Sequence, residues 1–106
     1  MSNLELLKKL IKIESISPND NGCFDVIKKQ FEDLDFSFRE TNYKNISNLI
    51  ITNGDSKNKT FCFLGHTDVV PPGPESEWTV PPFSAEIIDN KIYGRGTADM
   101  KGGVAC

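Results

Sequence analysis

The sequence has few cysteines and no long apolar run, and both shortages narrow the class of protein. Its three cysteines, Cys23, Cys62 and Cys106, are far apart and form no C-x-x-C pair. A disulfide framework is therefore not expected, and a reducing, cytoplasmic location fits better. No segment is long and apolar enough to span a bilayer. The first residues also lack the basic and then apolar run of a secretory signal, so no membrane partner is expected.

An excess of positive charge is also missing. The 106 residues carry a formal net charge of −3, and their lysines are scattered rather than clustered. Nucleic-acid binding usually needs a basic patch or stripe, so no nucleic-acid partner is expected. The chain is 38% hydrophobic and 25% charged, which is ordinary for one small globular domain.

Two helices are predicted in the first third of the chain. Apolar residues recur at helical spacing over residues 3–13 and again over residues 22–34. Ser2 followed three residues later by Glu5 predicts a capping box at the start of the first helix. Asp20 or Asn21 would cap the second.

Strand character follows the helices. Residues 36–38 alternate, residues 48–52 hold a short β-prone run, and residues 85–93 predict a hairpin that turns at Asp89-Asn90. The segment Phe61–Leu64 is apolar without alternation, as in a strand buried on both faces, with Cys62 as a small core residue. Residues 70–82 form a proline-rich loop. We therefore expect an α/β fold, with two N-terminal helices followed by a mixed β-sheet.

The first candidate site follows the apolar run directly. His66 is the only histidine of the chain, and Asp68 lies two residues beyond it. Ligands often bind at the carboxyl ends of strands, and a metal-bound histidine usually donates its second N–H to a carboxylate or carbonyl. In an extended segment residues 66 and 68 share a face, so Asp68 is placed for that role. A lone H-x-D pair is nevertheless common by chance, and a purely structural role stays open.

The second candidate is Asp99, within the glycine-rich segment 94–103. Glycines allow close backbone approach there, and Asp99 offers a hard oxygen ligand near a helix start. The alternative is an ordinary first-turn acid favoured by the helix dipole. The segment is not a dinucleotide fingerprint, because Asp99 stands where the third glycine of G-x-G-x-x-G would be. It also lacks the Gly-Lys-Ser or Gly-Lys-Thr of a phosphate loop.

Taken in order, several blocks resemble the co-catalytic zinc aminoacylase and carboxypeptidase family. They are G-H-T-D-V-V-P-P-G at residues 65–73, Trp78, P-P-F at residues 81–83, and G-R-G-T-A-D-M-K-G at residues 94–102. The V-V-P-P-G and P-P-F details favour the branch that hydrolyses the amide of N-succinyl-LL-2,6-diaminopimelate. That branch releases succinate and LL-diaminopimelate in lysine and diaminopimelate biosynthesis. Acetylornithine deacetylase or a related aminoacylase or peptidase is the alternative.

The resemblance implies a role for three residues of a two-zinc site, in which cobalt could replace one zinc. His66 would be a terminal ligand to one zinc, and the carboxylate of Asp99 would bridge both. Asp68 would orient and polarise His66 from behind, which is its catalytic role. The resemblance also implies a cis peptide bond between Asp99 and Met100, and a cytoplasmic homodimer that acts on a small-molecule substrate.

The same resemblance implies that parts of the active site are missing. The family needs further acidic residues downstream, including a glutamate as general base, and a late histidine, and it carries an inserted dimerisation domain. Two ligands do not close the coordination of two metals. The helix that starts after Asp99 also stops after about two turns, without a C-cap. We therefore expect residues 1–106 to be the amino-terminal part of a truncated catalytic domain that binds zinc weakly and is inactive alone.

Two other classes compete with this reading. A non-catalytic binding or regulatory domain that retains the fold would need a natural stop after Cys106, so the length of the open reading frame separates it from an enzyme fragment. A nucleotide-binding α/β domain is disfavoured by Asp99 in the glycine-rich segment.

Overall fold

Helix α1 (Asn3–Lys12) is the first element of the computed structural model, which describes all 106 residues. The predicted capping box is confirmed: the Glu5 amide donates to Ser2 Oγ over 3.2 Å, and the Ser2 amide donates to Glu5 Oε2 over 2.8 Å. These bonds satisfy amide groups that have no partner inside the helix. The hydrogen bonds of this box also lower the pKa of Glu5.

Helix α2 (Cys23–Lys29) is shorter than predicted. The N-cap residue is Gly22 instead of the predicted Asp20 or Asn21. The carboxylate of Asp20 nevertheless accepts from the amides of Gly22 and Phe24, so it satisfies donors at the start of the helix. After Lys29 the chain continues in tight turns instead of a helix up to residue 34. Phe31 packs its ring against Phe36, with ring centroids 4.9 Å apart. Phe31 recurs at helical spacing with the apolar residues before it, but it packs on the segment that follows and not within a helix.

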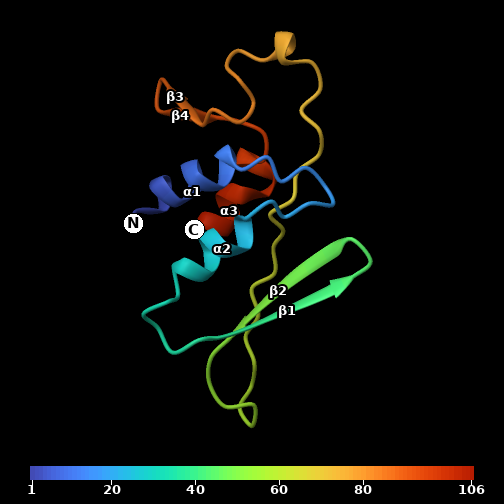
Figure 1. Cartoon of the computed structure of the whole chain (residues 1–106). Helices are drawn as coiled ribbons and strands as arrows, with labels where there is room; N and C mark the ends of the chain where they lie inside the picture. The colour runs from blue at the N-terminus through green and yellow to red at the C-terminus, as the bar shows by residue number, and fades with distance from the viewer.

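The strands form two separate antiparallel hairpins (Figure 1). Strand β1 (Ser37–Tyr43) pairs with β2 (Ile46–Thr52), and β3 (Glu86–Ile88) pairs with β4 (Lys91–Tyr93). Asp89 and Asn90 both have positive φ, as a two-residue hairpin turn requires, so this prediction is confirmed. The α/β class is confirmed too, but the expected single mixed sheet is not formed, because the two hairpins do not pair with each other.

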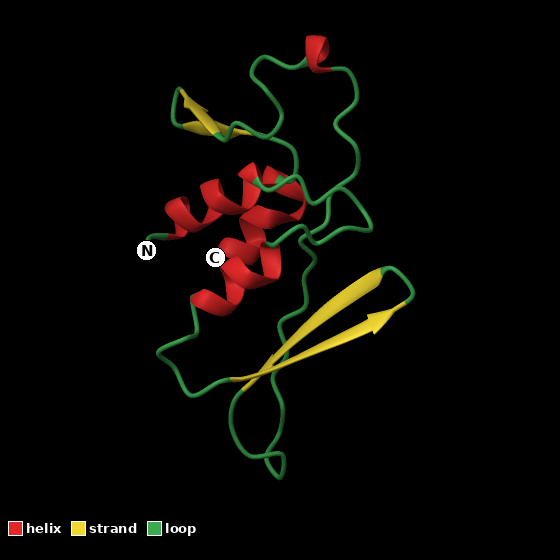
Figure 2. Ribbon diagram, viewed as in Figure 1, coloured by secondary structure: helices red, strands yellow, loops and turns green.

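The prediction of a buried strand at Phe61–Leu64 is wrong for this structure. These residues pair with no strand, and Phe61, Phe63 and Leu64 are 83%, 91% and 92% exposed. Cys62 is exposed rather than a core residue. A strand needs a neighbour for its backbone N–H and C=O groups, and no strand of these 106 residues pairs with it. Figure 2 shows this stretch as part of the long loop between β2 and β3, which is interrupted by the short 3-10 helix η1 (Glu75–Glu77).

The core lies where the three helices meet. Leu10 of α1, Cys23 of α2 and Ala105 of α3 (Gly102–Ala105) form its buried centre. Burial raises the pKa of the Cys23 thiol, and all three cysteines are free. None of the helices has the length and apolar character needed to cross a membrane. The packing of α3 on α1 fixes the segment before it, η2 (Thr97–Lys101), which carries Asp99.

Candidate metal site

The backbone around His66 is held by the segment that follows α1. The amide of Val69 donates to Ser15 O and the amide of Ser17 donates to Val69 O, each over 2.9 Å, which makes a short parallel bridge. The buried hydroxyl of Ser15 donates to Thr67 O over 2.7 Å. Residues 67–69 are thus fixed by three hydrogen bonds to a segment some 50 residues earlier in the chain.

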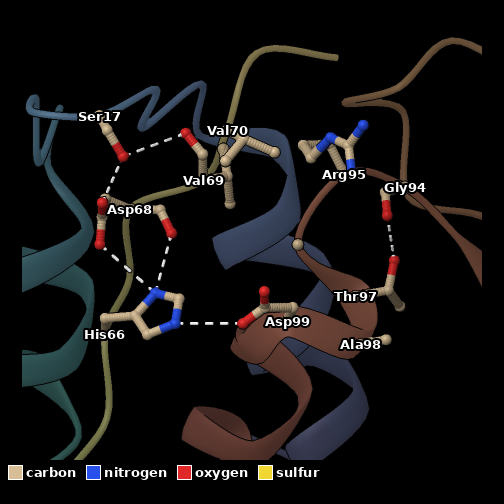
Figure 3. A pocket seen from close by; sticks show the side chains of 11 residues that line it. Ser17, His66, Asp68, Val69, Val70, Gly94, Arg95, Thr97, Ala98 and Asp99 are labelled. Atoms are coloured by element: carbon tan, nitrogen blue, oxygen red, sulfur yellow. Dashed lines mark hydrogen bonds and ion pairs between the residues drawn. The ribbon is translucent and has the colours of Figure 1, made fainter.

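The structure brings the three predicted site residues together. His66 Nδ1 lies 3.0 Å from Asp68 O and 3.4 Å from Asp68 Oδ1. On the other side of the ring, His66 Nε2 lies 3.1 Å from Asp99 Oδ1 (Figure 3). The side chains of His66 and Asp68 are about half exposed, and that of Asp99 is 89% exposed. All three line one pocket, so a ligand in that pocket can reach them.

This arrangement fits a cation between His66 and Asp99. A backbone oxygen accepts only, so Asp68 O fixes the ring proton on Nδ1 and leaves a lone pair on Nε2 of a neutral imidazole. That lone pair faces an ionised carboxylate, which also accepts only. Two acceptor atoms repel each other at this distance, so either a second ring proton or a metal ion must lie between them. Two ligands of one tetrahedral zinc, each at about 2.0–2.1 Å, lie about 3.3 Å apart, close to the 3.1 Å observed.

The segment that carries Asp99 is anchored to the carboxyl end of α1. Asp99 and Met100 interrupt η2 with non-helical backbone angles, and the peptide bond between them is cis, which confirms that prediction. Two residues on, the side chain of Lys101 is fully buried. Its ammonium donates to Leu10 O over 2.7 Å and to Ile13 O over 2.9 Å, at the carboxyl end of α1. Burial lowers the pKa of Lys101.

Gly96 is required where the glycine-rich segment turns into η2. Its φ is +87°, and a Cβ there would lie 2.6 Å from Val69 Cγ1. We expect Gly96→Ala to lower the free energy of unfolding by about 2–4 kcal/mol, since left-handed strain and a clash add. Gly54→Ala is the control, because φ is +96° there but no atom lies within 4 Å. Denaturant unfolding of both variants checks this, and an equal loss at the two positions would contradict it.

A pocket of about 260 Å³ opens in front of these residues. It is lined by eleven residues from three segments: Ser17, residues 66 and 68–70, and residues 94–99. His66, Asp68 and Asp99 all line it, as does Ser17, which the sequence did not indicate. No group of three or more His, Cys, Asp or Glu side chains is arranged to hold a metal ion. His66 and Asp99 could supply two ligands to a metal ion, which is fewer than a closed site needs.

Residues 62–106 match the family model described as Peptidase family M20/M25/M40. The matched region begins just before His66 and includes Asp68 and Asp99.

The whole chain is similar to curated proteins named succinyl-diaminopimelate desuccinylase. It is 45% identical over 102 residues to the protein from Vesicomyosocius okutanii subsp. Calyptogena okutanii, covering 96% of this chain and 27% of that protein. It is 46% identical over 104 residues to the protein from Dechloromonas aromatica, covering 98% of this chain and 27% of that protein. The chain thus spans about a quarter of the length of these relatives.

The fold matches the solved structure of a metallo-carboxypeptidase. An M20 family metallo-carboxypeptidase from Sulfolobus solfataricus superposes with a TM-score of 0.80 at 32% sequence identity. The match covers 99% of this chain and 25% of that chain. The helices and hairpins described above are therefore arranged as in part of an M20 metallopeptidase catalytic domain.

Proposed function

From the sequence pattern of the M20 peptidases in residues 62–106, we propose that this chain is the amino-terminal part of the catalytic domain of a zinc-dependent amidohydrolase. The longer protein, meaning the full-length protein proposed to contain residues 1–106, would hydrolyse the amide bond of N-succinyl-LL-2,6-diaminopimelate to succinate and LL-diaminopimelate. The observation that carries the proposal is the 3.1 Å approach of His66 Nε2 to Asp99 Oδ1 at the edge of one pocket. The names of the curated relatives support the substrate.

The residues of this chain fit part of a two-zinc centre. His66 Nε2 would bind one zinc, and Asp99 would bridge two because a carboxylate has two oxygens. Asp68 would hold the His66 ring through Nδ1. Two bound metals would acidify a bridging water and polarise the scissile carbonyl. We propose zinc for both positions, with cobalt able to replace one.

The remaining machinery would lie beyond residue 106. A glutamate general base, further acidic zinc ligands and a second histidine would come from the rest of the catalytic domain, and a separate domain would form the homodimer. With only His66 and Asp99, residues 1–106 cannot close a zinc coordination shell. This part alone would therefore bind zinc weakly and not turn over substrate.

A related M20 peptidase or aminoacylase, such as an acetylornithine deacetylase, is the second candidate. The observation in its favour is the 32% identity to the metallo-carboxypeptidase from Sulfolobus solfataricus. The residues at hand serve any of these reactions, because His66, Asp68 and Asp99 act on the metal and the water and not on the acyl group.

Steady-state hydrolysis by the longer protein distinguishes the candidates. We expect kcat/KM for N-succinyl-LL-2,6-diaminopimelate to exceed that for N-acetylornithine, and that for a dipeptide with a free carboxyl terminus, by at least about 100-fold. A site built to bind polar groups of its substrate rejects analogues that lack them. Residues 1–106 alone should show no turnover. A preference for either competitor would replace the desuccinylase assignment, and hydrolysis unaffected by removal of metal with a chelator would overturn the zinc mechanism.

A further inference from the structure

We infer that Ser17 is a positioning residue of the metal site, which holds the Asp68 carboxylate so that His66 presents Nε2 toward Asp99. The inference rests on the proposed function, because it concerns metal binding at His66. Ser17 lies in the loop after α1, and it reaches the pocket from a part of the chain that the family match at residues 62–106 does not include.

Each of the two carboxylate oxygens of Asp68 has its own partner. Ser17 Oγ donates to Asp68 Oδ2, while Asp68 Oδ1 lies 3.4 Å from His66 Nδ1 (Figure 3). The Ser17 hydroxyl has one proton, and its only other acceptor, Val69 O, is farther away at 3.4 Å. The proton is therefore directed at Asp68, and rotation of the carboxylate about its last bond would break this contact.

The backbone of Ser17 is itself fixed. Its amide donates to Val69 O over 2.9 Å, next to the bridge between Ile16 and Val69. The hydroxyl is thus delivered from the same short parallel pairing that holds residues 67–69. A site whose supporting residues are already in place loses less entropy when the metal binds.

The hydroxyl matters because Asp68 is open to water. The side chain of Asp68 is 46% exposed, so without Ser17 it would exchange between several orientations. His66 Nδ1 would then keep the backbone oxygen of Asp68 at 3.0 Å, but it would lose the carboxylate as a second partner that holds the ring. Removing a partner behind a metal-binding histidine typically weakens metal affinity about 10–100-fold.

A merely local role for Ser17 predicts a different result. Ser17 is exposed at the surface, so its loss as a loop contact would change stability slightly and leave zinc affinity alone. Zinc affinity and stability of the metal-free protein, measured on the same variants, separate the two roles.

The test uses the longer protein and three serine variants. Ser17→Ala removes the hydroxyl, Ser17→Thr keeps it, and Ser84→Ala removes a hydroxyl that bonds Pro81 O outside the pocket. Zinc dissociation constants come from competition with a chromophoric chelator, and Tm is measured on the metal-free protein. We expect Ser17→Ala to weaken zinc binding about 10–100-fold, with Tm within about 3 °C of the parent. Ser17→Thr and Ser84→Ala should bind zinc as the parent does.

His66→Ala, measured in parallel, keeps the two proposals apart. If Ser17→Ala binds zinc normally while His66→Ala does not, the role of Ser17 is overturned and the metal site stands. If zinc affinity survives in both variants, the proposed function fails. If Ser17→Ala loses Tm together with affinity and Ser17→Thr does not restore them, Ser17 is a structural residue and the inference is overturned.

Discussion

Replacing His66 with alanine is expected to abolish tight zinc binding by the longer protein. His66 is the only histidine among residues 1–106, and its Nε2 already points at the Asp99 carboxylate. Loss of a ligand should cost more than loss of a residue behind it, so we expect at least about a 100-fold rise in the zinc dissociation constant. Isothermal titration calorimetry with Zn²⁺ measures this directly. The unaltered chain of 106 residues should bind zinc weakly in the same experiment.

A pair of aspartate variants supplies the matched control. Asp99→Asn keeps the shape of the side chain and removes the charge that a bridging ligand needs, whereas Asp89→Asn makes the same change at the turn of the β3–β4 hairpin. We expect Asp99→Asn to weaken zinc binding as His66→Ala does, and Asp89→Asn to have no effect. If zinc affinity were unchanged in both His66→Ala and Asp99→Asn, these residues would have only a structural role.

The largest loss of stability is expected at Lys101. Its side chain is fully buried, and its ammonium ties the Asp99 segment to Leu10 O and Ile13 O at the carboxyl end of α1. Lys101→Ala would remove two charge-assisted hydrogen bonds and leave a cavity. We expect the free energy of unfolding to fall by about 3–5 kcal/mol, a large part of the 5–15 kcal/mol typical of a domain. Urea unfolding of the metal-free protein measures the loss, and a change below about 1 kcal/mol would contradict it.

Lys101→Met separates the charge from the packing of the stem. It should be less destabilising than Lys101→Ala, because the cavity is largely filled. Because burial lowers the pKa of Lys101, the unfolded chain binds the proton more tightly. This contribution to stability therefore rises with pH below the ordinary lysine pKa. As the pH rises toward the ordinary lysine pKa, about 10.4, the parent should gain stability relative to Lys101→Met. Cys23 and Asp20 act on Lys101 in the opposite direction to burial, and Lys101 in turn lowers the pKa of Cys23. The comparison therefore measures the titration of Lys101 together with its coupling to these two groups.

Local signals in the sequence predicted local structure well. The Ser2–Glu5 capping box, the strand at residues 48–52 and the hairpin at Asp89-Asn90 depend on neighbours within a few residues, and all are present. The approach of His66 to Asp99 followed from a family resemblance, because 33 residues separate them and no periodicity relates them.

Features that depend on distant partners could not be predicted in the same way. The apolar run Phe61–Leu64 looks the same whether or not a neighbouring strand pairs with it, and its burial was therefore wrongly predicted. Ser17 acts on Asp68 across 51 residues, and a single serine in a loop carries no local signal. Lysine side chains are mostly exposed in proteins, and Lys101 is a fully buried exception. Only the position of the α1 carboxyl end explains its burial.

The proposed function depends most on metal binding by His66 and Asp99. Crystals of the longer protein grown with zinc, with diffraction measured at the zinc absorption edge, test this most directly. We predict two anomalous peaks about 3.5–4 Å apart, one about 2.0–2.1 Å from His66 Nε2 and both beside the Asp99 carboxylate. Zinc peaks at other residues, with His66 Nε2 bonded only to protein atoms, would contradict the account.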